Sequence, residues 1–245
     1  MFYYLFTIQY DGTDFCGWAK QNGQSTIQGE IEASISRVAR NSIFRVVGAS
    51  KTDSGVHALD QKAWVELNFQ PNVEGFLKAL NRSLPLGIQV TNVEEINKDF
   101  RVRNCKEKTY EYKINVGSNN VFENRFYFLP KKEINLEKMK EALNLFVGEH
   151  DFFNFSGLKK EETESIATIR EIKSIDSFLQ DDIFTITFKG KGFIRYQIRM
   201  IVGACLAYAT GKIDLKKIKN FLELKQEKMP FIANPEGLLL KKINY

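Results

Sequence analysis

The strongest constraint on the fold is the order of segments in the first hundred residues, which runs strand, helix, strand, strand, helix, strand. The first helical segment repeats apolar residues at Ile27, Ile31 and Ile35, and Ser25 with Gln28 predicts a capping box at its start. The predicted strands are residues 2–10, 44–50, 61–69 and 88–96, and the predicted helices are residues 25–40 and 72–84. This order is that of a split βαβ unit.

The second half repeats this order of elements with larger insertions and without sequence identity to the first half. We expect strands at residues 108–116, 168–178, 182–190 and 237–245, and helices at residues 135–148, 194–211 and 214–224. The fold class is therefore α+β, with an N-terminal half at residues 1–104 and a C-terminal half at residues 105–245. Two such sheets side by side predict a cleft between the halves.

Composition limits the classes of protein that this chain can belong to. A hydrophobic content of 43% over 245 residues is typical of a globular protein, and no apolar run reaches the length of a membrane span. The three cysteines lie far apart without metal-ligand spacing, so we expect no disulfide framework, no zinc cluster and a cytoplasmic location. A net charge of +5 permits a nucleic-acid partner without requiring one.

A polar segment, "GASKTDSGVHALDQ" at residues 48–61, separates two of the predicted strands. Ser, Asp and Gly are ordinary hairpin residues, so a purely structural loop is the first interpretation. A simple hairpin, however, needs only about two to five loop residues. This segment is longer, and it places Lys51 and His57 close to Asp53. We therefore favour a functional loop.

The known catalytic patterns leave one candidate group in this loop. Ser54 with His57 would need an oxyanion hole, and no nucleophile-elbow motif is present. Asp11 and Asp14 could join Asp53 in a metal-dependent nuclease, although Asp-Gly after a strand is more often a turn. Zinc-deaminase, phosphate-loop and dinucleotide-binding motifs are also missing. What remains is chemistry that needs one ionised carboxylate and no cofactor or metal.

Three further positions carry side chains suited to an anionic or aromatic ligand. Within the predicted helix 194–211, Arg195 and Arg199 recur at helical spacing along the border of the apolar stripe, where they could bind an anion or a buried carboxylate. Tyr110 of "KTYEYKI" could stack on a base, whereas Tyr112 on the same strand face fits a core aromatic. The sequence also places Arg103 and His150 in loops.

Six motifs along the chain resemble those of the TruA family of tRNA pseudouridine synthases, in the same order. The motifs are "YDGTDFCGWAKQ", "GASKTDSGVHALDQ", "FRVR…KTYEYKI", "GEHDFFNFSG", "GFIRYQIRMIVG" and "EGLLLKKINY". The resemblance covers nearly the whole chain. It implies two ferredoxin-like halves that form a pseudo-symmetric extended antiparallel sheet, with helices on one face and a central active-site cleft. It also implies a homodimer that binds tRNA across both subunits.

The resemblance further implies a cofactor-free isomerisation of uridine to pseudouridine in the anticodon stem-loop, typically at positions 38 to 40. Asp53 matches the essential aspartate, which could attack C1′, attack C6 or start an elimination. Tyr110 matches the active-site tyrosine, stacked beside the base and a candidate for proton transfer, and Arg199 matches the arginine that pairs with the aspartate. We expect Lys51, Arg195 and Arg103 to contact the RNA.

One departure from the family pattern keeps a second hypothesis open. Lys51 stands where the family usually has arginine, and lysine lacks the planar guanidinium that stacks and donates in pairs. The alternative is a tRNA-binding or tRNA-folding protein that keeps the fold without the chemistry. Since Asp53, Tyr110 and Arg199 are all retained, we predict an active enzyme.

Overall fold

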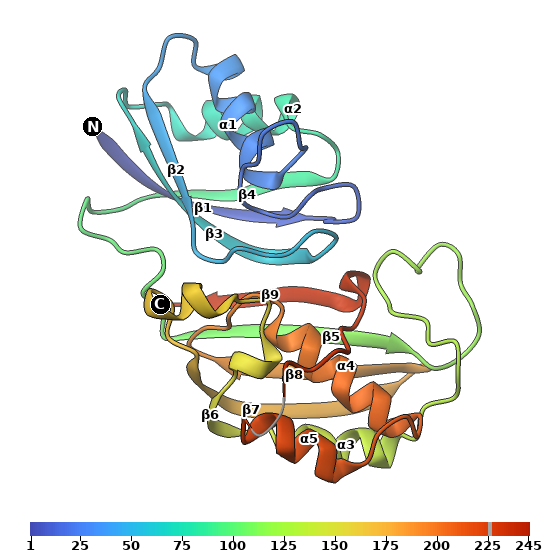
Figure 1. The fold of residues 1–245 in the computed structure, drawn as a ribbon. Helices are drawn as coiled ribbons and strands as arrows, with labels where there is room; N and C mark the ends of the chain where they lie inside the picture. The colour runs from blue at the N-terminus through green and yellow to red at the C-terminus, as the bar shows by residue number, and fades with distance from the viewer. Residues whose placement is uncertain (225–226) are drawn as a thin grey trace. The chain divides into compact units, whose positions relative to one another are not determined.

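The computed structural model describes residues 1–224 and 227–245, which form two compact units (Figure 1). Unit 1 comprises Met1–Lys106 together with Leu239–Tyr245, and unit 2 comprises Glu107–Leu238. Strands and helices occur in both units, and the strands pair mostly antiparallel, so the α+β fold class is confirmed. None of the helices in the described ranges is long and apolar enough to span a membrane.

Unit 1 has the ferredoxin-like arrangement that the order of its segments predicts. Its elements are β1 (Phe2–Tyr10), α1 (Ile27–Val38), β2 (Phe44–Gly48), β3 (His57–Leu67), α2 (Val73–Ser83) and β4 (Ile88–Glu95). Strand β1 lies between β4 and β3, and β2 pairs with the far side of β3; all three pairings are antiparallel. The strand order is therefore β4-β1-β3-β2, with the two crossover helices on one face of the sheet (Figure 1).

The core of unit 1 lies between this sheet and its two helices. Alternate residues of β3, among them Ala63, Val65 and Leu67, are fully buried because successive side chains of a strand point to opposite faces. The ring of Phe6 on β1 contacts Phe76 on α2 edge-on, with 6.4 Å between centroids. The apolar face of α1 is buried as the sequence predicts, but its N-cap is Thr26 rather than Ser25, since the Thr26 hydroxyl accepts from the Gly29 amide.

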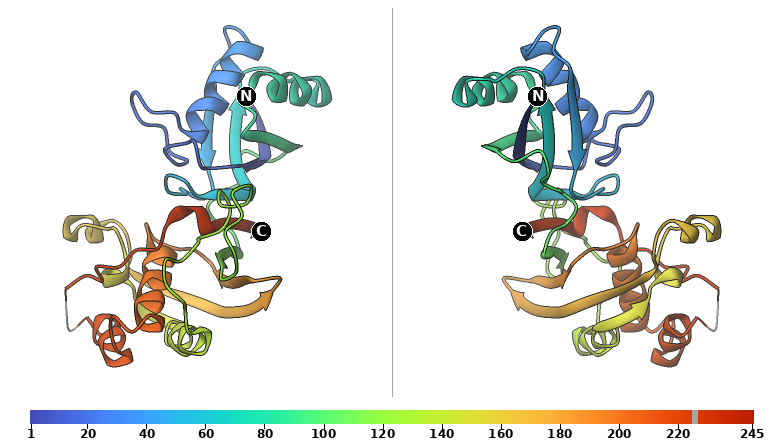
Figure 2. Two further views of the ribbon diagram at one scale, coloured as in Figure 1. Left: turned by 90° about the vertical axis from the view of Figure 1, so that its right-hand side faces the viewer. Right: turned by 90° about the vertical axis from the view of Figure 1, so that its left-hand side faces the viewer.

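The strands of unit 2 pair antiparallel in the order β5-β8-β7-β6. Its elements are β5 (Glu107–Asn115), α3 (Leu136–Asn144), β6 (Gly148–Asp151), β7 (Ile169–Gln180), β8 (Ile183–Gly190), α4 (Gln197–Ala209) and α5 (Leu215–Leu222). Short 3-10 turns lie at Phe153–Phe155, Lys160–Glu164 and Pro235–Gly237. Figure 2 shows α3, α4 and α5 gathered on one side of this sheet. The predicted hairpin is present as β7 and β8, whose turn places Asp181 and Asp182 at positive φ.

Two features of unit 2 differ from the expectation. His150 lies in β6, opposite Arg170 of β7, and not in a loop. Arg195 precedes α4 instead of lying in it, because Tyr196 adopts a left-handed backbone with φ 64° and the helix starts one residue later. The predicted helical alignment of Arg195 with Arg199 is therefore wrong.

The last strand, β9 (Leu238–Asn244), pairs parallel with β3 through His57–Leu239 and Ala58–Leu240. The amide of Ile243 also donates to the Asp60 carboxylate. By its contacts, all of β9 except Leu238 belongs to unit 1, and the first boundary lies after Lys106. The sequence-based division at residues 104 and 105 placed this strand in the second half, because chain order alone does not reveal the pairing of a terminal strand.

Candidate functional site

The loop that carries Asp53 is shorter than the sequence pattern suggests. Strand β2 ends at Gly48 and β3 already starts at His57, so the connection comprises residues 49–56. Lys51 is exposed, and the next residue, Thr52, is only 8% exposed. Asp53, which follows Thr52, is half-buried. The carboxylate therefore stands at the boundary between a packed interior and an accessible surface.

A buried hydrogen-bond network anchors the first half of this loop. The Gln61 amide side chain accepts from the Ser50 amide at 3.1 Å and donates to the Ser50 carbonyl at 2.8 Å. The same side chain donates to the Tyr10 hydroxyl, which lies 2.7 Å from the Thr52 hydroxyl. Since buried polar groups are costly when unsatisfied, this network strongly favours one loop conformation.

The segment "YDGTDFCGW" supports the second half of the loop by direct contact between backbones. A Cβ on Gly12 would lie 2.0 Å from the Val56 carbonyl oxygen, and a Cβ on Gly17, at φ +83°, would lie 2.8 Å from that of Thr52. The Trp18 amide donates to the Thr52 carbonyl at 3.0 Å, and the Gly55 amide donates to the Phe15 carbonyl. Glycine at both positions permits an approach that no side chain would allow.

Three other polar residues of the loop motif, His57, Ser54 and Asp60, have structural partners. Nδ1 of His57, a residue only 3% exposed, accepts from the Gly12 amide at 3.1 Å, and the Ser54 hydroxyl donates to the Phe15 carbonyl. This arrangement does not form a Ser–His nucleophile pair. Asp60 pairs with Lys62 at 2.7 Å. Asp60 lies in β3, outside residues 49–56, so Asp53 is the carboxylate that the loop itself carries.

Tyr110 is held by aromatic packing within unit 2. It lies on β5 opposite Phe188 of β8, is 8% exposed, and meets the Phe193 ring edge-on with 5.3 Å between centroids. Edge-to-face packing fixes the plane of a phenol ring. The contact with Phe193 therefore fixes the orientation of the Tyr110 ring on β5.

Tyr112, two residues along the same strand, belongs to the core as predicted. Its hydroxyl donates to the Asn234 carbonyl at 2.9 Å, and a Cβ on Gly237 would clash with its ring at 2.8 Å. Burial first, and the charge of Glu236 second, hold the pKa of Tyr112 well above its ordinary value, while the charge of Arg199 opposes them. This phenol remains protonated at neutral pH.

Arg199 is a half-buried residue in the first turn of α4. Its Nε donates to the Ala233 carbonyl at 2.8 Å, and the Ala233 amide donates back to the Arg199 carbonyl at 2.9 Å. Its guanidinium carbon lies 5.4 Å from the centroid of the Tyr196 ring. These contacts orient the guanidinium group from within unit 2.

Arg195 is engaged in an ion pair on the loop before α4. Its guanidinium lies 2.7 Å from the Glu162 carboxylate and also donates to the Gly157 carbonyl. A backbone hydrogen bond from Lys159, and next the Arg195 side chain, lower the pKa of Glu162. Contact of Arg195 with a phosphate would have to compete with these bonds.

The predicted site residues thus fall into two groups. Asp53, Lys51 and Arg103 lie in unit 1, where Lys51 and Arg103 are exposed and Arg103 Nε is 3.5 Å from the Gly48 carbonyl. Their predicted counterparts in unit 2 are Tyr110, Arg195 and Arg199. In each unit, contacts made inside that unit hold the segment that carries the chemical candidate.

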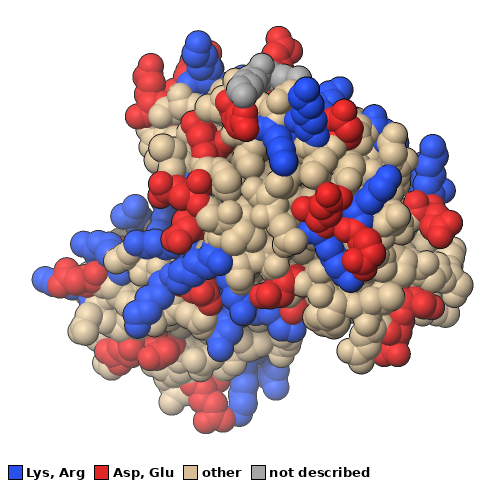
Figure 3. Space-filling model, turned by 90° about the horizontal axis from the view of Figure 1, so that it is seen from below, with Lys and Arg blue, Asp and Glu red and all other residues tan. Residues whose placement is uncertain are grey.

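Charge on the visible surface is mixed. Figure 3 shows lysine and arginine side chains interspersed with carboxylates on the face seen from below, without a continuous basic surface. Within residues 1–224 and 227–245, no group of three or more His, Cys, Asp or Glu side chains lies in an arrangement suited to a metal ion.

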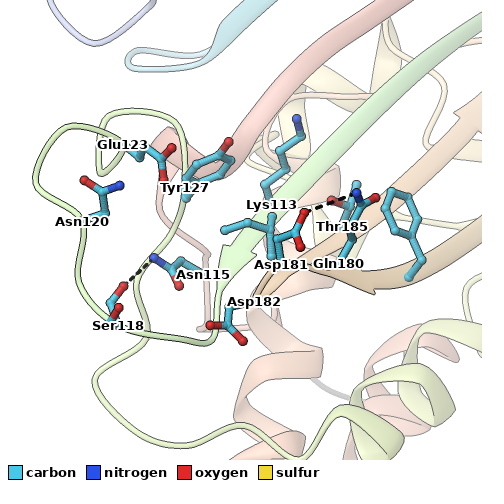
Figure 4. Close-up of a pocket in the computed structure, with 12 residues that line it drawn as sticks. Lys113, Asn115, Ser118, Asn120, Glu123, Tyr127, Gln180, Asp181, Asp182 and Thr185 are labelled. Atoms are coloured by element: carbon cyan, nitrogen blue, oxygen red, sulfur yellow. Dashed lines mark hydrogen bonds between the residues drawn. The ribbon is translucent and has the colours of Figure 1, made fainter.

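A cavity of about 560 Å³ lies at the end of the β7–β8 hairpin in unit 2 (Figure 4). Its lining includes the carboxylates of Glu123, Asp181 and Asp182 against the single ammonium of Lys113. Because three carboxylates repel phosphate, this cavity is a poor site for RNA. None of the predicted site residues lines it.

The residues that hold the Asp53 loop were not predicted from the sequence. Gln61 could have been found, because it takes an inward position in line with Ala63, Val65 and Leu67 on a buried strand face. A polar residue at such a position needs a partner. The roles of Gly12 and Gly17 depend on tertiary contacts and had no local signal beyond a turn.

Comparison with known proteins identifies the family. The model of a family described as tRNA pseudouridine synthase matches residues 7–103 and 142–245. The tRNA pseudouridine synthase A of Mesoplasma florum is 49% identical over 247 residues, covering 99% of this chain and 98% of the relative. That of Spiroplasma kunkelii is 40% identical, covering 100% and 95%, and tRNA pseudouridine synthase A 2 of Bacillus cereus is 39% identical, covering 99% of each. The chain therefore belongs to the tRNA pseudouridine synthase family.

Proposed function

We infer that this protein is an enzyme, an isomerase that converts uridine to pseudouridine in tRNA. The observation that carries the inference is family membership over nearly the full chain, with Asp53 on a rigidly supported loop. In this reaction the N1–C1′ bond breaks, the base turns, and C5 bonds to C1′. The proton lost from C5 is balanced by one gained at N1, so no redox partner or external group is consumed.

Asp53 is the proposed nucleophile or base. A carboxylate that attacks must be ionised and held in place, because a mobile group loses the advantage of pre-organisation. The buried Gln61 network and the backbone contacts of Gly12 and Gly17 supply that rigidity. Half-burial leaves the carboxylate accessible to a ribose.

Tyr110 and Arg199 are the proposed partners of Asp53 in the active-site cleft. Tyr110 would stack beside the target base and could transfer the proton at C5, since its ring is already fixed against Phe193. Arg199 would pair with Asp53 and keep its carboxylate charged, because a neighbouring cation favours the ionised form. The Ala233 carbonyl orients Arg199 for this task.

Lys51, Arg103 and Arg195 are the proposed RNA contacts. Lys51 and Arg103 are exposed cations in unit 1. Lys51 precedes Asp53 by two residues, and Arg103 contacts the Gly48 carbonyl at the end of β2. Arg195 would contribute least, because Glu162 already occupies its guanidinium. Such contacts neutralise phosphates and weaken as salt rises.

The substrate region that we propose is the anticodon stem-loop, and the proposed location is the cytoplasm.

The active form would be a homodimer. Exposed apolar side chains in unit 2 support this: Val121 is 69% exposed, Phe122 87% and Phe178 53%. The carboxylates around the adjacent cavity disfavour RNA at this surface. Phe122→Ser should raise the dimer dissociation constant in sedimentation experiments, and an unchanged value would count against this surface.

The decisive experiment compares Asp53→Asn with Asp60→Asn. Asparagine at residue 53 should preserve folding and tRNA binding while abolishing tritium release from 5-³H-uridine tRNA. Asp60→Asn is the matched control, since its amide oxygen can still accept from Ile243 and the activity should persist. Wild-type binding without tritium release would instead support the non-catalytic tRNA-binding alternative.

A further inference from the structure

The start of α4 contains an unusual residue directly beside Arg199. Tyr196 is the N-cap of this helix, yet its φ of 64° and ψ of 0° place it in the left-handed region, which non-glycine residues seldom adopt. Its side chain makes no capping hydrogen bond. Such strain persists where surrounding contacts enforce it, and it often marks functional positions.

The Tyr196 ring contacts the arginine three residues ahead. The guanidinium carbon of Arg199 lies over this ring at 5.4 Å from its centroid, while Arg199 Nε donates to the Ala233 carbonyl. A cation over an aromatic face is attracted to it. Together, the ring and the carbonyl fix the guanidinium in two directions.

Gly157 contacts the Tyr196 ring along the Cδ2–Cε2 edge. A Cβ on Gly157 would lie 2.3 Å from Tyr196 Cδ2, and the Gly157 amide donates to the Arg195 carbonyl at 2.8 Å. The Arg195 side chain bonds back to the Gly157 carbonyl. These bonds hold the backbone on both sides of Gly157 against Arg195 and Tyr196.

Two cations attach the loop around Gly157 to the rest of unit 2. Arg195 pairs with Glu162, and Lys228 donates to the Ser156 carbonyl at 2.9 Å. The Lys228 ammonium also lies 4.3 Å from the centroid of the Phe153 ring. The loop is thereby fastened before and after Gly157, so that one side of the Tyr196 ring, which is 38% exposed, faces a fixed backbone.

We propose that Tyr196 is a positioning residue for Arg199: its left-handed backbone places its ring under the guanidinium, and the close approach of Gly157 keeps it there. This inference rests on the proposed function, in which Arg199 pairs with the reacting aspartate. It predicts an effect on the chemical step and little effect on tRNA binding.

The test compares Tyr196→Gly with Tyr196→Phe. Glycine tolerates the left-handed backbone but removes the ring, so this variant should fold normally. Its kcat should fall about 2- to 5-fold while KM is unchanged, which is the range of a lost cation–π contact at a partly exposed site. Phenylalanine keeps the ring and should restore most of the lost kcat. A matched control is Leu224→Gly, at another left-handed residue (φ 57°), which should leave both constants unchanged.

A third variant tests the contact from the loop. Gly157→Ala should displace the Tyr196 ring and lower kcat in the same direction, with tRNA affinity retained. A Tyr196→Gly enzyme with wild-type kcat would overturn the proposal. A rise in KM at constant kcat would also overturn it, since that result would indicate an RNA contact.

A measurement without turnover separates this inference from the proposed function. Solvent exchange of the Arg199 Nε proton, assigned in NMR spectra through Arg199→Lys, should become several-fold faster in Tyr196→Gly. Unchanged exchange would overturn the positioning role even if the enzyme is active. If exchange rises but wild type and Asp53→Asn are equally inactive, the proposed function fails and the positioning contact stands.

Discussion

The two units of this protein orient their candidate residues by different means. In unit 1, the Asp53 loop is held by a buried side-chain network and by backbone contacts that require glycine at residues 12 and 17. In unit 2, an ion pair, a cation–π contact and carbonyl groups of irregular segments hold the region around Arg199. The first arrangement is buried and tolerates little change, whereas the second is partly exposed and should respond gradually to mutation.

The largest effect is expected where backbones touch. Gly17→Ala should cost about 2–4 kcal/mol of unfolding free energy for two reasons. The new Cβ would meet the Thr52 carbonyl, and alanine would have to adopt the positive φ of this residue. Gly23→Ala is a matched control, because Gly23 also has a positive φ of +71° but a Cβ there would meet nothing within 4 Å. It should cost only about 1 kcal/mol. Chemical denaturation would measure both. Equal losses would show that the backbone contact does not stabilise unit 1.

The buried network should give the next largest effect. Gln61→Leu leaves the amide and carbonyl of Ser50 without their side-chain partner, so we expect a loss of about 2–3 kcal/mol and a reduced kcat. Tyr10→Phe removes only the hydroxyl and should cost about 1 kcal/mol. A Gln61→Leu enzyme with full stability and full activity would contradict the rigid-loop account.

A smaller effect is expected at Lys51. Lys51→Arg restores the side chain that the family resemblance implies at this position, and arginine adds a planar group that can stack and donate in pairs. We expect kcat/KM to rise by about two- to fivefold with no change in melting temperature. The tritium-release assay at fixed salt would measure it, and a decrease would mean that the loop is adapted to lysine.

The smallest effect belongs to the exposed ion pair of unit 2. Glu162→Gln should lower the melting temperature slightly at neutral pH. The folded-state pKa of Glu162 is lowered, so its contribution is present above the unfolded pKa and is lost as pH falls through the folded value. Melting curves of wild type and variant should therefore converge in acid. If the difference in melting temperature between wild type and Glu162→Gln stayed constant from neutral to acid pH, the effect would come from packing and not from charge.

Sequence periodicity predicted most of the helices and strands correctly, because the spacing of apolar residues depends on the local geometry of each element. Strand β1 and the helices α1 and α2 were predictable because their apolar spacing matches the geometry of each element. Asp53 was proposed from the sequence as the carboxylate of a long polar loop, with a role taken from the motif order, and that role stays a prediction. The family assignment from these motifs is confirmed by the comparisons.

Only the tertiary structure decided three other features. The start of α4 follows the left-handed backbone of Tyr196, whose ring packs against Gly157 of a distant loop. The placement of β9 beside β3 depends on the pairing of His57 with Leu239, two residues that lie far apart in the chain. The support of Asp53 by Gly12 and Gly17 depends on two loops meeting backbone to backbone. Local patterns record the conformation that each segment prefers, while contacts between distant segments decide where its chemical groups stand.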